Sequence, residues 1–131
     1  KTYVVTGTLT SARTVALDKP IVFEEFGLAR DVNSFDPTSS VEWRDRYYDE
    51  IFAYLLDHAQ GDRVAGANIW AVAGEARPVV PFGSFWEPGD PFIGDPPHEQ
   101  QGWYSVYDTD VSTLAIITMY SELMTELCGE R

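Results

Sequence analysis

The chain has 131 residues, a formal net charge of −12, and a composition that is 44% hydrophobic and 14% aromatic. Its length fits at most one domain, and its apolar content is enough for a packed core, which argues against intrinsic disorder. The negative charge and the few, scattered basic residues argue against binding to nucleic acid or to an anionic membrane, whereas neutral ligands remain compatible.

The first part of the chain predicts the end of a helix and then a buried strand. Residues 9–17 fit a helix end, which Pro20 stops. Ile21–Phe23 are uniformly apolar, which is typical of a parallel-sheet strand covered on both faces. Residues 28–40 are polar and predict a loop that leads into a helix. Because the chain begins with Lys1 and contains neither a signal-peptide pattern nor an 18-residue apolar run, we expect a soluble chain that is processed or truncated.

An amphipathic helix is predicted between Val41 and His58. Apolar positions recur there at spacings of three and four, and they are Trp43, Tyr47, Ile51, Tyr54, Leu55 and His58. A turn at residues 60–62 leads to a second apolar run, Val64–Val72, which predicts a second buried strand.

Residues 73–110 predict a long loop that is rich in proline, glycine and aromatic side chains. A loop of this length in a compact domain is usually functional, and its aromatic content indicates a packed binding loop. Within it, we expect Arg77 to form a salt bridge with a loop carboxylate. A final helix is predicted from Ser112, as the N-cap, to Leu127, and Gly129 closes it.

The sequence offers no pattern of metal ligands. The only cysteine, Cys128, cannot form an internal disulfide, and Cys and His residues are not spaced as in zinc sites. His58 and His98 are single histidines with expected structural or solvated roles. Four aspartates lack the spacing of a calcium loop, so we expect loop capping or solvation for Asp90, Asp95, Asp108 and Asp110. We therefore expect no metal and no cofactor.

The predicted order of elements is two successive βα units after the tail of a helix. Two parallel strands alone do not close a sheet. A complete eight-stranded barrel needs roughly 250 residues. The chain is therefore either part of such a barrel or a small open α/β sheet.

Two carboxylates, Glu24 and Glu25, directly follow the first apolar run. In parallel α/β structures the C-terminal strand ends face the active site, so acidic residues there suggest function more than those on a helix surface. Because side chains alternate along a strand, we expect Glu24 and Glu25 to face opposite ways, and either could face the site. Taken alone, such a pair is more often an ordinary solvated turn.

The segment KPIVFEEFG, residues 19–27, resembles the seventh-strand motif of clan A retaining glycoside hydrolases, and GANIW, residues 66–70, resembles the eighth strand of glycoside hydrolase family 5. The long loop resembles the eighth loop of endo-β-1,4-mannanases of that family in ARP at 76–78, FWEPGD at 85–90, GDP at 94–96, QQGW at 100–103 and SVYD at 105–108. The resemblance implies that residues 1–131 form one partial domain. That domain is the C-terminal part of a (β/α)8 TIM barrel, comprising strands 7 and 8 with their helices.

The resemblance also implies a function, the retaining hydrolysis of β-mannan, glucomannan or galactomannan. Glu25 matches the nucleophile, and Trp70 matches the floor beneath the sugar. Trp86 is our candidate for a further substrate contact. The acid/base Glu of the family comes from the fourth strand, so we expect the isolated chain to be inactive and to need the missing N-terminal part of the barrel. Such enzymes are usually secreted or periplasmic, and we expect the same here.

Two other functions fit the same residues. A non-catalytic carbohydrate-binding or assembly fragment would use Trp70, Trp86 and Trp103 as a stacking platform. Another clan A β-glycanase, such as a glucanase, would share Glu25 and Trp70 but not the FWEPGD loop. The loop aromatics could also simply pack the loop onto the barrel rim.

Overall fold

The computed structural model describes residues 21–59, 64–79 and 83–129. In chain order these residues form β1 (Ile21–Phe26), the short 3-10 helix η1 (Asp31–Asn33), α2 (Glu42–Ala59), β2 (Val64–Ile69), β3 (Val72–Gly74), β4 (Val106–Tyr107) and α3 (Val111–Gly129). The predicted helix end at residues 9–17 and the predicted turn at residues 60–62 lie outside the described residues. Within those ranges, no helix combines the length and the apolar character needed to cross a bilayer.

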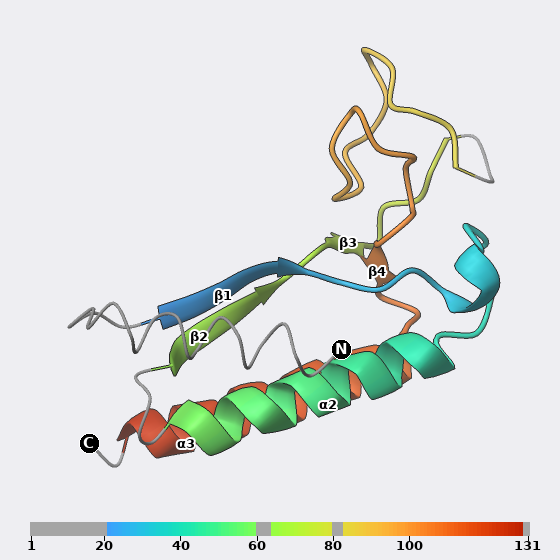
Figure 1. Cartoon of the computed structure of the whole chain (residues 1–131). Coiled ribbons are helices and arrows are strands. Elements are labelled where there is room, and N and C mark those ends of the chain that lie inside the picture. The colour runs from blue at the N-terminus through green and yellow to red at the C-terminus, as the bar shows by residue number, and fades with distance from the viewer. Residues whose placement is uncertain (1–20, 60–63, 80–82, 130–131) are drawn as a thin grey trace.

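Strands β1 and β2 pair in parallel, and helices α2 and α3 lie side by side on one face of this pair (Figure 1). Two side chains of α3 join it to α2, because the Thr113 hydroxyl donates to Asp45 and the Tyr120 hydroxyl donates to Asp49 Oδ1 over 2.9 Å. The predicted succession of two parallel βα units is therefore confirmed. This arrangement is consistent with part of a (β/α)8 barrel.

The apolar core lies between the sheet and the helices. Leu55, Ala59 and Val64 are buried there, and Ile21 and Phe23 pack against them. On the opposite face of the sheet, the side chain of Val22 is 47% exposed. The expectation that the first strand is covered on both faces is not met within the described residues, because their helices cover one face only (Figure 1).

Helix α2 confirms the predicted helix, and it confirms the predicted apolar face in its second half, where Leu55 is buried and Ile51 and Tyr54 pack against the core, but not in its first half. Arg44, Tyr48, Leu55 and Ala59 are buried, whereas Trp43 is 59% exposed. In the first half of the helix, the buried positions lie one residue later in the sequence than predicted. A hydropathy pattern does not predict this shift, because it treats arginine as a surface residue. Arg44 is buried here because an ion pair with Asp110 compensates its charge.

Helix α3 begins two residues earlier than predicted. Val111 is its first residue, and Leu114 N donates to Asp110 O over 2.9 Å. Asp110 therefore occupies the N-cap position, and the prediction of Ser112 as N-cap is wrong. The sequence pattern favoured the serine because the carboxylate of Asp110 is held by two distant arginines that local spacing does not reveal.

The predicted second strand is interrupted near its end. Strand β2 stops at Ile69, the Trp70–Ala71 peptide bond is cis, and β3 then pairs in parallel with β4. The long loop is therefore not irregular throughout, because β3 and β4 join its two ends. A further antiparallel bridge between Phe85 and Gln100 narrows its middle.

Candidate functional site

The end of β1 contains a bulge at its two glutamates. Phe23 pairs with β2, and Phe26 pairs only two residues further along β2, so β1 has one extra residue between them. Glu25 has a φ of 57°, in the left-handed region. Phe23 packs on the helix core, and Phe26 also contacts the aromatic rings of α2. The two glutamates between them are both exposed, so the regular in-and-out alternation of a strand is interrupted over residues 23–26.

Glu24 is bonded to the neighbouring strand. Asn68 Nδ2 donates to Glu24 Oε1 over 3.2 Å. Asn68 lies two residues before Trp70, within the GANIW segment. Sequence reasoning did not identify Asn68 as part of the site, because an asparagine in an apolar run carries no signal of which strand it will face.

A glycine contact brings the ends of β1 and β2 together. Trp70 N donates to Phe26 O over 2.9 Å, which extends the pairing beyond β2. The Cα of Gly27 then lies so close to Trp70 that a Cβ built on it would be 1.9 Å from Trp70 O. Only glycine permits this approach. The structure therefore places Glu25 and the half-buried Trp70 on adjacent strand ends, as the sequence motifs suggested.

A buried aspartate holds the long loop in shape. Asp95 Oδ2 accepts from Gly102 N and from Ser105 Oγ, both over 2.8 Å, and Asp95 Oδ1 accepts from Tyr104 N over 3.2 Å. Gln101 Nε2 also donates to the Asp95 carbonyl over 3.0 Å. The expected loop-capping role is confirmed for Asp95. No cluster of possible metal ligands occurs among the residues that the structure describes.

Residues 83–105 of the long loop extend beyond the ends of β1 and β2 (Figure 1), and Trp86 belongs to this segment. Its indole Nε1 donates to Asp90 O over 3.0 Å, so the N–H group of the ring forms its hydrogen bond within the loop. Its ring lies 5.7 Å from the ring of Phe92, centroid to centroid. Phe92 is 69% exposed and Phe85 is 57% exposed. The loop therefore presents an aromatic surface to solvent.

The predicted loop salt bridge of Arg77 is present. Arg77 Nη2 lies 2.6 Å from Asp108 Oδ1, and this hydrogen bond lowers the pKa of Asp108 below its usual value. The guanidinium also lies 4.4 Å from the centroid of the Tyr107 ring. These contacts secure the last turn of the loop before α3.

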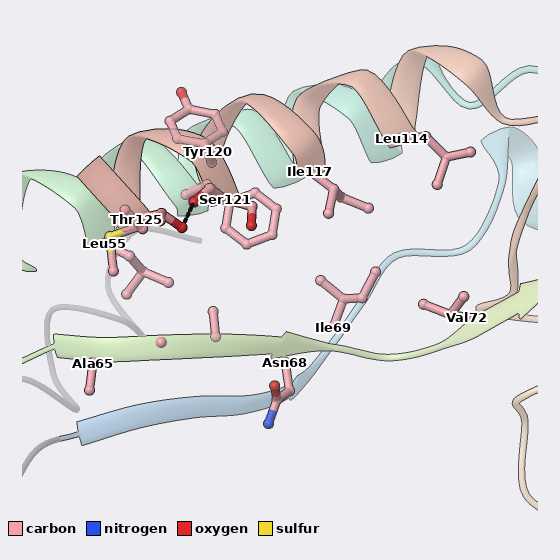
Figure 2. Close-up of a pocket in the computed structure, with 14 residues that line it drawn as sticks. Leu55, Ala65, Asn68, Ile69, Val72, Leu114, Ile117, Tyr120, Ser121 and Thr125 are labelled. Carbon is pink, nitrogen blue, oxygen red and sulfur yellow. Dashed lines mark hydrogen bonds between the residues drawn. The ribbon is translucent and has the colours of Figure 1, made fainter. Parts of the chain in front are cut away.

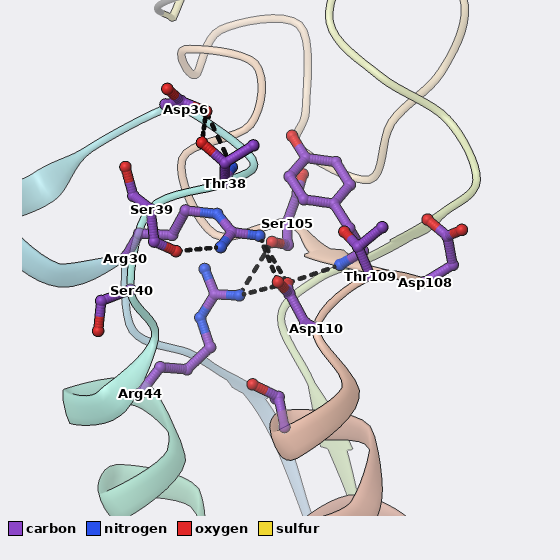
Figure 3. A network of polar contacts seen from close by, with 12 residues as sticks. Arg30, Asp36, Thr38, Ser39, Ser40, Arg44, Ser105, Asp108, Thr109 and Asp110 are labelled. Atoms are coloured by element: carbon purple, nitrogen blue, oxygen red, sulfur yellow. Dashed lines mark hydrogen bonds and ion pairs between the residues drawn. The ribbon is translucent and has the colours of Figure 1, made fainter.

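Arg30, Arg44 and Asp110 form a buried polar cluster (Figure 3). Arg30 Nη2 donates to both carboxylate oxygens of Asp110, over 2.6 and 2.7 Å, and Arg44 Nη1 donates to Asp110 Oδ2 over 3.1 Å. Burial, and then the charge of Arg30, lower the pKa of Arg44. Sequence reasoning missed both arginines, because nothing in their local spacing predicts burial.

An apolar cavity of about 670 Å³ lies elsewhere, between β2 and α3 (Figure 2). Its lining includes Ile69, Leu114, Ile117 and Met124, and it contains neither Glu25 nor Trp70. Polar groups suited to a sugar are few there. We therefore place the candidate site at the strand ends and not in this cavity.

Comparison with known proteins assigns the motifs to one family. A family model described as "GH family 5 beta-mannosidase-like" matches residues 2–128. The structure is similar to that of a glycoside hydrolase family 5 mannosidase from Rhizomucor miehei, with 33% sequence identity and a TM-score of 0.79, over 95% of this chain and 32% of that chain. A variant of the same enzyme in complex with mannosyl-fructose is similar at 33% identity and a TM-score of 0.78, with the same coverage. No curated protein sequence matches the chain. The chain thus spans about a third of the length of the structures it matches.

Proposed function

The chain belongs to the β-mannosidase-like members of glycoside hydrolase family 5, and from this membership we propose that it is part of a retaining enzyme that hydrolyses β-mannosidic bonds with Glu25 as its nucleophile. The observation that carries the proposal is the packing of Gly27 against the Trp70 carbonyl. This backbone contact joins the carboxyl ends of the two parallel strands at which Glu25 and Trp70 lie, and barrel enzymes carry their active sites at such strand ends.

The proposed reaction has two displacements at the anomeric carbon. A carboxylate oxygen of Glu25 attacks this carbon, the glycosidic C–O bond breaks, and the leaving oxygen takes a proton from a second carboxylic acid. Water then attacks the same carbon, gives a proton to that second carboxylate, and releases Glu25 from the ester. The two carboxyl groups of a retaining enzyme lie about 5–5.5 Å apart.

The second carboxyl group comes, in this proposal, from a part of the barrel that precedes β1. Glu24 is not that group, because it adjoins Glu25 in the same strand and its Oε1 is bonded to Asn68. The 131-residue chain alone therefore forms no complete active site and hydrolyses no mannan. Its partner in catalysis is the N-terminal part of the same barrel.

Trp70 and Trp86 have separate roles in substrate binding in this proposal. Trp70, beside the strand that carries Glu25, provides an apolar floor for the sugar that is cleaved. Trp86, with Phe92 against its ring, contacts the polymer further from the bond. Sugar sites combine aromatic faces with a few polar groups, and a neutral polymer is compatible with the net charge of −12. No cofactor or metal is required for this chemistry.

The long-loop motifs favour an endo-acting mannanase that works on β-mannan, glucomannan or galactomannan. An exo-acting β-mannosidase is the second candidate, because the family model and the similar structures are described as mannosidases. The products separate the two possibilities. An endo-acting enzyme cleaves mannohexaose internally, whereas an exo-acting enzyme releases mannose from one end. A polymer-degrading role would also place the protein outside the cytoplasm, in the periplasm or the medium.

The decisive experiment compares two isosteric variants of the complete gene product that contains this chain. We expect Glu25→Gln to abolish mannoside hydrolysis, whereas Glu24→Gln, one residue away, retains measurable turnover. A chimera that joins this chain to the preceding two thirds of the Rhizomucor miehei mannosidase provides a second background. Full activity of Glu25→Gln in both backgrounds would refute the assignment.

A binding assay addresses the non-catalytic alternatives. A carbohydrate-binding fragment would be retarded in a mannan gel as the isolated chain, and Trp86→Ala would remove that retardation. A glucanase would instead hydrolyse β-glucan faster than mannan. Neither result is expected if the chain is part of a mannan hydrolase that needs the rest of its barrel.

A further inference from the structure

One buried arginine on α2 reaches the chain segments that follow both strand ends of the proposed site. Arg44 Nε donates to Leu28 O over 2.9 Å, and Arg44 Nη1 donates to Ser105 O over 3.1 Å. Leu28 directly follows Gly27, the residue that packs on the Trp70 carbonyl. The first of these bonds therefore holds the segment that leaves β1.

The second bond holds the segment after Trp70. Ala71 N donates to Tyr104 O over 3.3 Å, and Val106 N donates to Ala71 O over 2.8 Å. The residues on both sides of Ser105 are thus bonded to the residue that follows Trp70. A single guanidinium therefore joins the two segments that follow Glu25 and Trp70. Figure 3 shows the contacts of Arg44 with Ser105 and Asp110.

Asp110 holds this guanidinium in place. It accepts from Arg44 and, through both oxygens, from Arg30, and it also accepts from Tyr107 N over 2.9 Å. Buried ion pairs usually add little net stability compared with apolar residues of similar size. Moreover, Arg44 Nη2 is buried and has no hydrogen-bond partner among the described residues. Stability alone is therefore a poor explanation of why the cluster is charged.

We propose that Arg44 and Asp110 are positioning residues that fix Glu25 relative to Trp70. The inference rests on the proposed function. Neither residue touches the sugar or takes part in proton transfer. Their effect is to keep the attacking oxygen and the sugar platform in register, and a misplacement of about 1 Å costs roughly 100-fold in rate.

The test uses a mannosyl fluoride with fluorine at carbon 2, which esterifies the nucleophile of a retaining mannosidase and accumulates on it. In the complete protein, mass spectrometry of the labelled peptide gives two separate quantities, the fraction of sites that react and the rate constant per reacting site. We expect Arg44→Met to lower this rate constant about 10- to 100-fold. We expect Arg44→Lys, which keeps the charge and one donor, to lie between this variant and the wild type.

The matched control is Arg46→Met, on the same helix. Arg46 is exposed, pairs with Glu50 one turn further on over 3.2 Å, and lies 5.7 Å from the centroid of the exposed Trp43 ring, so this change should leave the labelling rate constant unaltered. If Arg44→Met reacts at fewer sites but with the wild-type rate constant, the cluster is merely structural and the inference is wrong. Should Arg44→Met not fold, Arg44→Lys and Asp110→Asn decide by the same measurement. If the wild type itself is not labelled at Glu25, the proposed function fails first.

Discussion

The contact between Gly27 and Trp70 yields the sharpest prediction, because both its geometry and its consequence can be worked out. In Gly27→Ala the new methyl group would lie 1.9 Å from Trp70 O, more than 1 Å inside the 3.0 Å that real Cβ atoms keep. Backbone, not a flexible side chain, is what the methyl group meets. The strand ends must therefore separate by about 1 Å, and overpacking of this kind costs about 1–3 kcal/mol.

The same displacement falls on the proposed site. Glu25 is two residues before Gly27, so a separation of about 1 Å moves the carboxylate relative to Trp70 and should lower kcat/KM roughly 100-fold. The assay is mannoside hydrolysis by the complete protein, together with its free energy of unfolding in urea. Gly66→Ala in β2 is the control, because a Cβ there meets nothing within 4 Å among the residues that the structure describes. Wild-type kcat/KM in Gly27→Ala would refute the reasoning.

Three further predictions concern the loop and the helices, each measured in the complete protein. Asp95→Asn should cost about 1–3 kcal/mol, because it turns a donor toward buried donors, and should speed proteolytic cleavage between residues 83 and 105, whereas Asp90→Asn should not. Asp31 accepts from Ser40 Oγ and from the first amides of α2, and these bonds, that of Ser40 foremost, lower its pKa below 3.8. The stabilisation of the fold by ionised Asp31 is therefore present above pH 3.8 and lost as the pH falls further. Asp31→Asn should make the free energy of unfolding in urea depend less on pH in this acid range. An unchanged pH dependence there would contradict the prediction. Burial, and then the hydrogen bond to Asp49, raise the pKa of Tyr120 to about 12. The contribution of the Tyr120 hydroxyl to stability is therefore complete below its pKa in the unfolded chain, about 10, and is lost as the pH rises toward 12. Tyr120→Phe should remove one late-titrating tyrosine from a titration of tyrosinate absorbance.

The elements of this fold could be predicted because each has a strong local signal. The apolar run at Ile21–Phe23, the apolar spacing of residues 42–59 and the helix before Gly129 all depend on neighbours in the sequence. The motif around Glu25 was likewise contiguous. The sequence therefore predicted the identity and order of the elements, and it indicated the strand ends at which the candidate site lies.

Features that depend on contacts between residues far apart in the sequence could not be predicted from it. The bulge at Glu25 is set by how β1 pairs with β2, and it overturns the alternation that a strand normally imposes. The burial of Arg44 requires Asp110, which is 66 residues away in the sequence. For the same reason, the N-cap of α3 is Asp110 and not the predicted Ser112. Polar residues that become buried through partners far along the chain leave no hydropathy signal.

The geometry of this half-site and the stability of the chain depend on different parts of the molecule. Glu25 and Trp70 are placed by contacts that lie wholly within the described residues, namely the Gly27 approach and the bonds of Arg44. The helix–sheet core, in contrast, leaves a cavity of about 670 Å³ beside β2 and exposes Val22 on the other face. Apolar surface of this kind stabilises a protein only once it is covered. The proposed site is therefore held by local contacts, whereas stability of the whole chain is expected to depend on further elements of a barrel that cover the cavity and the open face of the sheet.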